Sequence, residues 1–517
     1  MIPIIINILW ISLCLHGANS AKILGIFPAP SFSHQQTFQP IWKELSLRGH
    51  NVTVITTNPL GNNSLINLTE INVGFTYEHL LNSSFIQHLY EPDSVFRKVY
   101  DIHRLGLEIN EAQIMHEKIQ HILNENETKF DLILIQVVQS FTDLTFGYAA
   151  KYKCPVVGIS SLGVFFHFHD FLGNPTHPVV SPDMMLGFAG KINFFQKLQS
   201  LLYNLWYRLF YYWYILPNAD RVARKHFGDD MPYLGDIERN MSLLLVNSNP
   251  VIHAVRPNVP NIVEICRLHI SEKKPLPKDI KDYLDSSTQG VVYFSLGSNV
   301  KSTYLSVEVR QEIIKALGEL PYNVLWKWET DHLPDRPPNV LTRKWLPQQD
   351  ILGHPNIKAF VTQGGLQSIE EAITNEVPLV GIPFITDQPS NIKRIVELGM
   401  GQMVEQQTLT KEKLKKAILE VAGDPEYKEN VSKAKSIMDD QPMKGVDKAV
   451  WWIEYVIRHN GAKHLRSQAA DMSFFEYFMI DVALFLFACI FAMYYLVAKI
   501  VSAAKQCTNS NNKVKRN

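Results

Sequence analysis

The sequence predicts an α/β protein with two doubly wound parallel sheets that face a cleft, followed by one transmembrane helix. Short apolar segments alternate with helical periodicity in two series, in residues 22–246 and 291–382. A proline-rich stretch with little periodicity, residues 257–277, separates the two series. Residues 478–498 carry one charge, Asp481, and are long enough to cross a bilayer.

The first series opens with a βαβ unit. Residues 22–27 and 52–56 form apolar strands, and Gly49 ends the intervening helix, for which Ser33 is the expected N-cap. Four apolar residues at helical spacing form the buried face of that helix: Phe38, Ile41, Trp42 and Leu45. Further strands are expected at residues 130–135, 156–159, 243–246, 291–296, 324–328, 357–361 and 378–382, and helices near 104–123 and 143–151.

These patterns divide the 517-residue chain into seven segments. They are a signal peptide (1–20), an N-terminal domain (21–256), a linker (257–289), a C-terminal domain (290–440), an amphipathic helix and stalk (441–472), a transmembrane segment (473–498) and a basic tail (499–517). Two doubly wound domains joined by a linker place a ligand between them, at the carboxyl ends of the strands.

Composition and the chain ends indicate the compartment. The apolar run of residues 2–15 ends in Ala18-Asn-Ser20, which is typical of a cleaved signal peptide. The tail after the span carries Lys and Arg without acids, so the C-terminus is expected in the cytosol and the bulk of the chain in the lumen. The last five residues, 513–517, fit a dilysine pattern for return to the endoplasmic reticulum. Seven glycosylation sequons agree with a lumenal chain.

The chain is expected to bind a small molecule rather than nucleic acid, because 50 Lys and Arg balance 50 Asp and Glu. Cys154 and Cys266 leave room for one lumenal disulfide, and their spacing does not suit a metal. Residues 194–216 are aromatic but contain Lys197 and Arg208, which predicts a helix at the membrane interface, along the acceptor pocket, or in the core. The oligomeric state stays open.

Residues 345–388 contain the groups of a nucleotide-sugar pocket. A strand ending at Val361 is followed by a Gly-Gly turn and a helical segment, an arrangement that binds phosphate. An aromatic ring, two carboxylates and two amides nearby suit base stacking and hydroxyl binding: Trp345, Glu371, Asp387, Gln348 and Gln388.

The order and spacing of these residues resemble the signature of the UDP-glycosyltransferases, in the animal membrane-bound branch and most like its insect members. The resemblance is tight over residues 360–388 and looser from about residue 21 to the C-terminus. It implies the GT-B fold, with an N-terminal acceptor-binding half and a C-terminal half that binds the UDP-sugar. No metal or other cofactor is expected, because backbone donors and a helix dipole can neutralise the diphosphate.

The resemblance assigns donor contacts residue by residue. Trp345 would stack on uracil, Gln348 would reach the uracil or ribose, and Glu371 would bind the ribose, with Glu370 left solvated. The sugar hydroxyls would be bound by Asp387 and Gln388. Contacts to the diphosphate would come from Ser298, Gln363, Gly365, Gln367 and Ser368. The family commonly has His where this chain has Gln363, and an amide can still donate there.

His34 is the expected general base, because it matches the catalytic His of the family and lies at the first turn of a helix, where the dipole favours a neutral ring. The family orients this His with an Asp directly after the strand at residues 130–135, where this chain has Gln136. Asp143, seven residues further on, is the predicted acidic partner, with a helix-capping role as the alternative. The Gln136 amide could instead hold the ring by a hydrogen bond, so the choice between Asp143 and Gln136 as the partner of His34 stays open.

The sequence thus predicts an inverting glycosyltransferase that moves a sugar from a UDP-sugar to a hydroxyl of a small lipophilic acceptor. The insect-like resemblance favours glucose, and glucuronate stays open as the donor sugar. Two alternatives are a weakly catalytic binding protein for a nucleotide sugar or lipophile, suggested by Gln136, and a dedicated lipid glycosyltransferase, suggested by residues 194–216.

Overall fold

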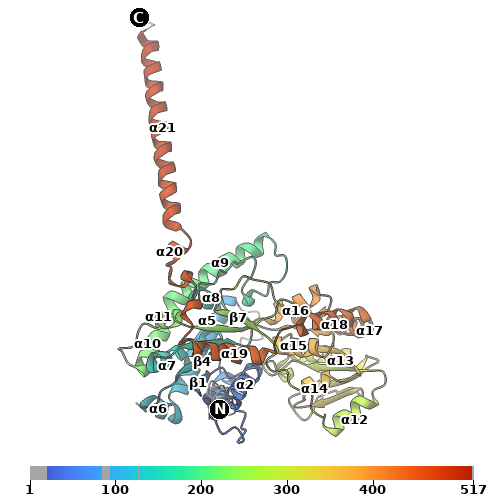
Figure 1. The fold of residues 1–517 in the computed structure, drawn as a ribbon. Coiled ribbons are helices and arrows are strands. Elements are labelled where there is room, and N and C mark those ends of the chain that lie inside the picture. Colours follow the sequence, from blue (N-terminus) through green and yellow to red (C-terminus); the bar gives the residue numbers. More distant parts are fainter. Residues whose placement is uncertain (1–19, 84–93, 126, 515–517) are drawn as a thin grey trace, which may run out of the picture. The chain divides into compact units, whose positions relative to one another are not determined.

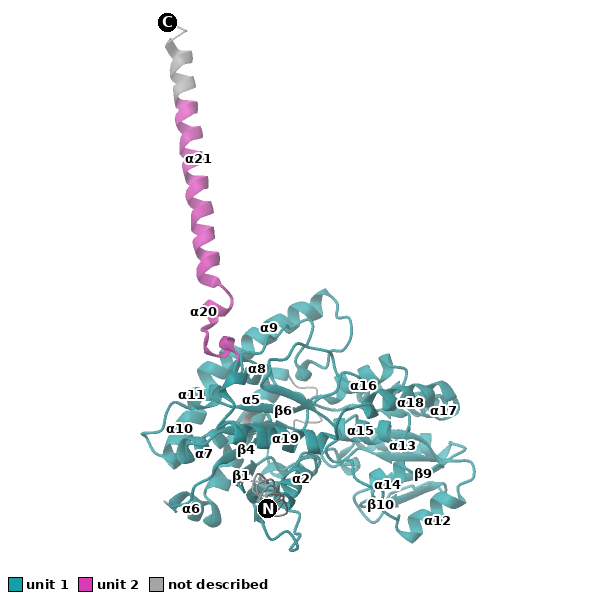
Figure 2. Ribbon diagram, viewed as in Figure 1, with its two compact units in different colours: residues 1–466 teal, residues 467–517 magenta. Residues whose placement is uncertain are grey.

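The structure is a computed structural model that describes residues 20–83, 94–125 and 127–514. The chain forms two compact units, residues 1–466 and 467–517 (Figure 2). The predicted signal peptide lies outside the described residues except for Ser20, as do the last three residues of the tail.

The N-terminal half of the first unit contains a seven-stranded parallel sheet in the order β3-β2-β1-β4-β5-β6-β7. Every residue of β4, β5 and β6 is buried, as expected for strands covered on both faces. The strands are β1 (Lys22–Phe27), β2 (Asn51–Thr56), β3 (Leu68–Asn72), β4 (Leu132–Gln136), β5 (Val156–Ser160), β6 (Leu243–Asn247) and β7 (Ile262–Ile265).

The helices of this half are α2 (Phe32–Leu47), α3 (Thr76–Leu81), α5 (Val95–Ile114), α6 (Glu117–Asn124), α7 (Phe146–Tyr152), α8 (Phe166–Phe171), α9 (Phe194–Phe210), α10 (Leu216–Phe227) and α11 (Leu234–Arg239). The expectation that Ser33 caps α2 is wrong: Ser31 occupies the N-cap with extended backbone, and Ser33 lies within the first turn. Cys154 and Cys266 are both free thiols.

The C-terminal half contains a six-stranded parallel sheet in the order β10-β9-β8-β11-β12-β13. The strands are β8 (Val291–Ser295), β9 (Asn323–Lys327), β10 (Val340–Arg343), β11 (Ile357–Thr362), β12 (Leu379–Gly381) and β13 (Gly401–Met403). The helices are α12 (Lys278–Ser286), α13 (Val307–Gly318), α14 (Gln348–Leu352), α15 (Leu366–Thr374), α16 (Gln388–Glu397), α17 (Lys411–Gly423) and α18 (Pro425–Asp439).

The segment predicted as a linker contributes to both halves, since β7 completes the first sheet and α12 belongs to the second half. After α18, the chain returns to the N-terminal half as α19 (Gly445–Arg458) and packs on α2 (Figure 1). The apolar face of α19, including Val450 and Ile453, joins the buried cluster around Phe38 and Trp42. Burial of each such side chain contributes roughly 1.5–3 kcal/mol to the free energy of unfolding. The packing of α19 therefore holds the chain that leaves the C-terminal half against the N-terminal half.

The aromatic segment has two different faces. The face of α9 and of the following π-helix (Tyr211–Ile215) that carries Tyr203, Tyr207 and Tyr211 is buried, so core packing is confirmed for that face. The opposite face exposes eight large apolar side chains: Phe194, Phe195, Leu198, Leu201, Leu202, Leu205, Leu209 and Trp213.

The second unit contains α20 (Phe474–Tyr477) and α21 (Ile480–Val514). Residues Ile480–Gln506 of α21 are 27 residues that contain an 18-residue window with a mean hydropathy of 2.3. At 1.5 Å per residue this length is about 40 Å, more than the hydrocarbon thickness of a bilayer. The expected C-terminal apolar helix is therefore present, and it begins seven residues after the predicted start.

Candidate active site

The candidate site is built where strand order reverses in each sheet. β1 pairs with both β2 and β4, and β8 pairs with both β9 and β11, so the loops after these strands diverge to opposite sides. His34 follows β1 and Gln136 ends β4, whereas Ser298 follows β8 and Gln363 follows β11. These four residues therefore all lie at the carboxyl ends of the central strands.

Side chains from the two halves meet next to His34. Ser31 Oγ and Asn299 Oδ1 are 3.2 Å apart, and the rings of Phe32 and Trp345 meet edge to face with centroids 4.9 Å apart. These contacts place the loop that begins α2 against the loops of the C-terminal sheet. Trp345 is still 58% exposed, so a face of its ring is accessible to a planar base.

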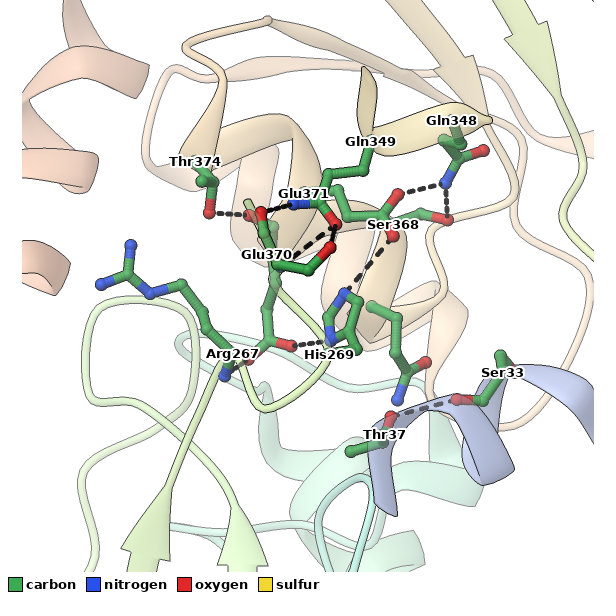
Figure 3. Close-up of polar contacts among 12 residues, drawn as sticks. Ser33, Thr37, Arg267, His269, Gln348, Gln349, Ser368, Glu370, Glu371 and Thr374 are labelled. Atoms are coloured by element: carbon green, nitrogen blue, oxygen red, sulfur yellow. Dashed lines mark hydrogen bonds and ion pairs between the residues drawn. The ribbon is translucent and has the colours of Figure 1, made fainter. Parts of the chain in front are cut away.

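Gln348 is the centre of a polar network at the start of α14 (Figure 3). Its Nε2 donates to Ser368 Oγ at 2.9 Å and to Glu371 Oε2 at 2.7 Å, and its Oε1 accepts from the Tyr293 hydroxyl at 3.2 Å. Three residues predicted to contact the donor are thus joined directly. The network fixes their side chains before any ligand arrives, which lowers the entropic cost of binding.

The adjacent carboxylates of α15 have different surroundings (Figure 3). Glu370 was expected to be solvated, and this is wrong: it is 1% exposed, accepts from the Arg267 backbone N–H at 3.0 Å and from Asn247 Nδ2 at 3.3 Å, and pairs with His269. The reason is that α15 packs against the loop after β7, so the face carrying Glu370 points inward. Glu371 lies beside Gln348 at the edge of the pocket.

His269 was not singled out from the sequence, yet its ring lies between the two carboxylates. Its Nδ1 is 3.6 Å from Glu370 Oε2 and its Nε2 is 3.4 Å from Glu371 Oε1. Burial lowers the pKa of His269, but the neighbouring carboxylates outweigh burial and raise it above its usual value. No sequence pattern marks this residue, because it is brought to α15 only by the packing of the two halves.

The glycine turn before α15 has the geometry of a ligand cradle. Gly364 has a φ of +87°, which only glycine adopts readily, and Gly365 forms the N-cap of α15. If Gly365 carried a Cβ atom, the nearest atom to it would be Gln363 Nε2 at 3.5 Å, an ordinary contact distance. The space beside this turn is therefore open. Gln363 Oε1 is buried without a hydrogen-bond partner among the described residues. Ser298, in the turn after β8, is half-buried.

Gln367, predicted to reach the diphosphate, is already engaged. Its Nε2 donates to the Ser161 carbonyl of the N-terminal half at 2.8 Å. This hydrogen bond ties the start of α15 to the loop after β5. In this structure Gln367 therefore joins the two halves.

Asp387 and Gln388 begin α16. The Asp387 carboxylate accepts from Asn391 Nδ2 at 2.7 Å, and burial raises its pKa to about 6. Gln388 Oε1 accepts from the backbone N–H groups of Phe384 and Ile385 at 2.9 and 3.1 Å, which shapes the preceding loop. Asn391, which sequence reading missed, also donates to the Gly364 carbonyl at 3.0 Å and so links α16 to the glycine turn.

A cavity of about 410 Å³ adjoins Asp387. It is lined by α16 on one side and by two segments of the N-terminal half on the other, within residues 163–190 and 246–264. Its position beside the sugar-binding candidates suits a small acceptor or the donor sugar. Arg256, another residue that the sequence did not single out, contributes a buried guanidinium whose Nε and Nη2 have no partner among the described residues.

His34 lies in the first turn of α2 and is half-buried. Burial lowers the pKa of its imidazole to about 4, so the ring is neutral near pH 7. Its Nδ1 is 3.5 Å from Gln136 Nε2, and Gln136 Oε1 accepts from the Ala29 backbone N–H at 3.1 Å. Gln136, the departure from the family pattern, is therefore the residue that contacts the imidazole.

Asp143, the predicted acidic partner, points elsewhere. It begins the 3-10 turn Asp143–Thr145, is fully buried, and lies 3.9 Å from Nδ1 of His103 on α5. Burial raises the pKa of Asp143 to about 8. The expected pair of His34 and Asp143 does not form among the described contacts, because the turn directs the carboxylate toward α5 rather than toward the loop after β1.

Among the described residues, no group of three or more His, Cys, Asp or Glu side chains is arranged to hold a metal ion. The amides, hydroxyls and backbone N–H groups at the start of α15 supply neutral donors for an anionic ligand. This donor set is the chemistry that a diphosphate requires at a helix N-terminus.

The fold and the site define the class of protein. Solved glycosyltransferases with two facing parallel sheets are similar to this protein over most of the chain. SnogD from Streptomyces nogalater matches with a TM-score of 0.55 and 16% identity, over 84% of this chain and 100% of that one. CalG4, the calicheamicin glycosyltransferase, matches with a TM-score of 0.53 and 19% identity, over 85% of this chain and 99% of that one. The protein therefore has the GT-B fold of glycosyltransferases, as expected.

The family follows from the sequence comparisons. The family model described as UDP-glucoronosyl and UDP-glucosyl transferase matches residues 21–516, and the chain belongs to this family. It is similar to UDP-glucosyltransferase 2 of Dactylopius coccus, with 35% identity over 95% of both chains. It is also similar to UDP-glucuronosyltransferase 2B7 of Homo sapiens, with 30% identity over 96% of this chain and 95% of that protein. The predicted family and the assignment as an enzyme are confirmed.

Proposed function

We propose that this UDP-glycosyltransferase transfers glucose, with inversion, from UDP-glucose to a hydroxyl of a small lipophilic acceptor. The observation that carries this proposal is the preorganised network of Gln348, Ser368 and Glu371, beside the exposed ring of Trp345 and across from His34. The choice of glucose rests on the similarity to an insect UDP-glucosyltransferase.

In the proposed reaction, the donor occupies the C-terminal half. Uracil stacks on Trp345 and the ribose hydroxyls donate to Glu371. The diphosphate lies at the N-terminus of α15, where Gln363 Nε2 can donate and the space beside Gly365 is open. Asp387 binds sugar hydroxyls next to the cavity of about 410 Å³. Charge that develops on the departing UDP is stabilised by fixed donors at that helix terminus.

His34 is proposed as the residue that contacts the acceptor oxygen and, where that oxygen arrives as a neutral hydroxyl, takes its proton. A neutral ring at the carboxyl end of β1, beside the contacts between the halves, can meet an acceptor that enters from the N-terminal side. The oxygen then attacks the anomeric carbon on the face opposite UDP. The acceptor itself would be held by the N-terminal half.

The proposed location is the endoplasmic reticulum membrane, with residues 21–472 in the lumen. The apolar helix Ile480–Gln506 and the basic residues after it support this orientation. Lipophilic acceptors concentrate at a membrane surface.

The test is a microsomal assay with labelled UDP-glucose and a panel of phenols, using the full-length chain. His34→Ala is expected to lower turnover by roughly 10²–10⁴-fold, the usual contribution of a general base, with UDP affinity retained. His332→Ala, an exposed histidine of the C-terminal half, is the matched control and should keep full activity. Undiminished turnover of the His34 variant would exclude this role.

A second function, sequestration of a nucleotide sugar or lipophile with weak catalysis, is motivated by Gln136 in the position of the family Asp. The same assay separates the two functions. Binding alone predicts retention of labelled UDP-glucose with no glucoside formed from any phenol.

A further inference from the structure

Gln136, the residue that contacts the imidazole of His34, determines which of the two ring nitrogens carries the proton. Gln136 is fully buried at the end of β4, and its two amide atoms face different groups. Because a backbone N–H can only donate, the amide atom 3.1 Å from the Ala29 nitrogen must be the oxygen. The amide nitrogen is thereby turned toward His34.

An amide nitrogen donates and does not accept. The imidazole nitrogen that faces it, Nδ1 of His34 at 3.5 Å, is therefore the unprotonated nitrogen of the neutral ring. The proton is then on Nε2, which makes no hydrogen bond with any described residue and is not enclosed. A carboxylate at position 136 would produce the opposite arrangement, with the proton on Nδ1 and a bare Nε2.

From this geometry we propose that Gln136 is a positioning residue that makes the enzyme selective for acidic acceptors that arrive ionised, namely carboxylic acids and acidic phenols such as para-nitrophenol, over alcohols. The proposal rests on the proposed function and names its acceptor class. The ring presents Nε2–H to the acceptor, and this group can donate to an oxyanion. To take a proton from a neutral alcohol, the ring must first change tautomer and lose its hydrogen bond to Gln136.

With an ionised acceptor the reaction needs no proton transfer. The acceptor oxyanion, held by His34 Nε2–H, forms a bond to the anomeric carbon. The bond from that carbon to the UDP oxygen breaks, and its electron pair leaves with UDP. With an alcohol, the imidazolium formed would face an amide rather than a carboxylate, which cannot stabilise it by charge.

The test compares acceptors of similar size and different acidity: para-nitrophenol, phenol and benzyl alcohol, each with UDP-glucose. In the wild-type enzyme, kcat/KM is expected to fall steeply as the acceptor becomes less acidic, with benzyl alcohol at the limit of detection. This comparison requires no substitution. Comparable kcat/KM for benzyl alcohol and para-nitrophenol would overturn the proposal.

Gln136→Glu is the matched variant, because Glu has the same length and two acceptor oxygens, one for the Ala29 N–H and one for Nδ1–H of His34. The ratio of kcat/KM for benzyl alcohol to that for para-nitrophenol is expected to rise by ~100-fold, the scale of general-base catalysis. Gln36→Glu is the control: it adds the same charge on the exposed face of α2, two residues from His34, and should leave the ratio unchanged.

The outcomes separate the two proposals. A ratio that stays low in a Gln136→Glu enzyme that binds UDP normally would refute the role of Gln136, while activity on phenols would leave the proposed function intact. Binding of UDP-glucose without glucoside from any acceptor would instead refute the proposed function. A purely structural role for Gln136 would change kcat/KM for all acceptors together and leave the ratio fixed.

Discussion

Neighbouring carboxylates on α15 allow the donor pocket to be tested against an internal control. Glu371→Gln keeps the size of the side chain but removes the charge that is proposed to accept from the ribose hydroxyls. A hydrogen bond to a charged group contributes about 1.5–3 kcal/mol, and each 1.4 kcal/mol is tenfold in affinity, so the Kd for UDP should rise by roughly 10–100-fold. Isothermal titration of UDP into the purified full-length chain in detergent measures this change.

Glu370→Gln is the matched control, because the same substitution one residue earlier lies in the buried contact between the halves. There it weakens the contacts to the Arg267 backbone and to His269, at a cost of about 1–3 kcal/mol. A lower Tm with little change in UDP affinity is therefore expected. If the Glu371 variant binds UDP like the wild type, or if both variants lose affinity equally, the assignment of Glu371 to the ribose is refuted.

Two further predictions concern stability. Burial raises the pKa of Asp143 to about 8, whereas in the unfolded chain the same carboxyl releases its proton near pH 4. The native state therefore binds one proton more than the unfolded state between these pH values. The free energy of unfolding should be highest at low pH and fall as pH rises toward 8, by at most about 1.4 kcal/mol per pH unit. Asp143→Asn should reduce that slope in urea unfolding at pH 5 and 8, and an unchanged slope would contradict the assignment. Gly364→Ala should lower Tm strongly, because φ is +87° and the new Cβ would lie 2.3 Å from Ile392 Cγ1. Gly365→Ala should keep the fold but weaken UDP binding. Equal Tm values for the two alanine variants would show that the turn is not constrained as described.

The strands that carry the site and the order of the donor residues can be read from the amino-acid sequence alone. Apolar runs such as residues 132–135 and 359–361 are visible locally, because a strand segment buried on both faces is rich in apolar residues. The short edge strands β3, β10 and β13 were not predicted, because they carry partly exposed residues without a long apolar run. The donor segment was recognisable because its residues lie within 44 positions of one another.

Which polar side chains become neighbours depends on the tertiary structure. His34 and Gln136 are 102 positions apart and become neighbours because β1 pairs with β4 in register. Asp143 is nearer to Gln136 in sequence but turns toward His103 on another helix. His269 and Glu370 come together through packing of the two halves. Periodicity reports which face of an element is apolar, whereas the partner of a polar group depends on strand register and helix orientation, which no local pattern contains.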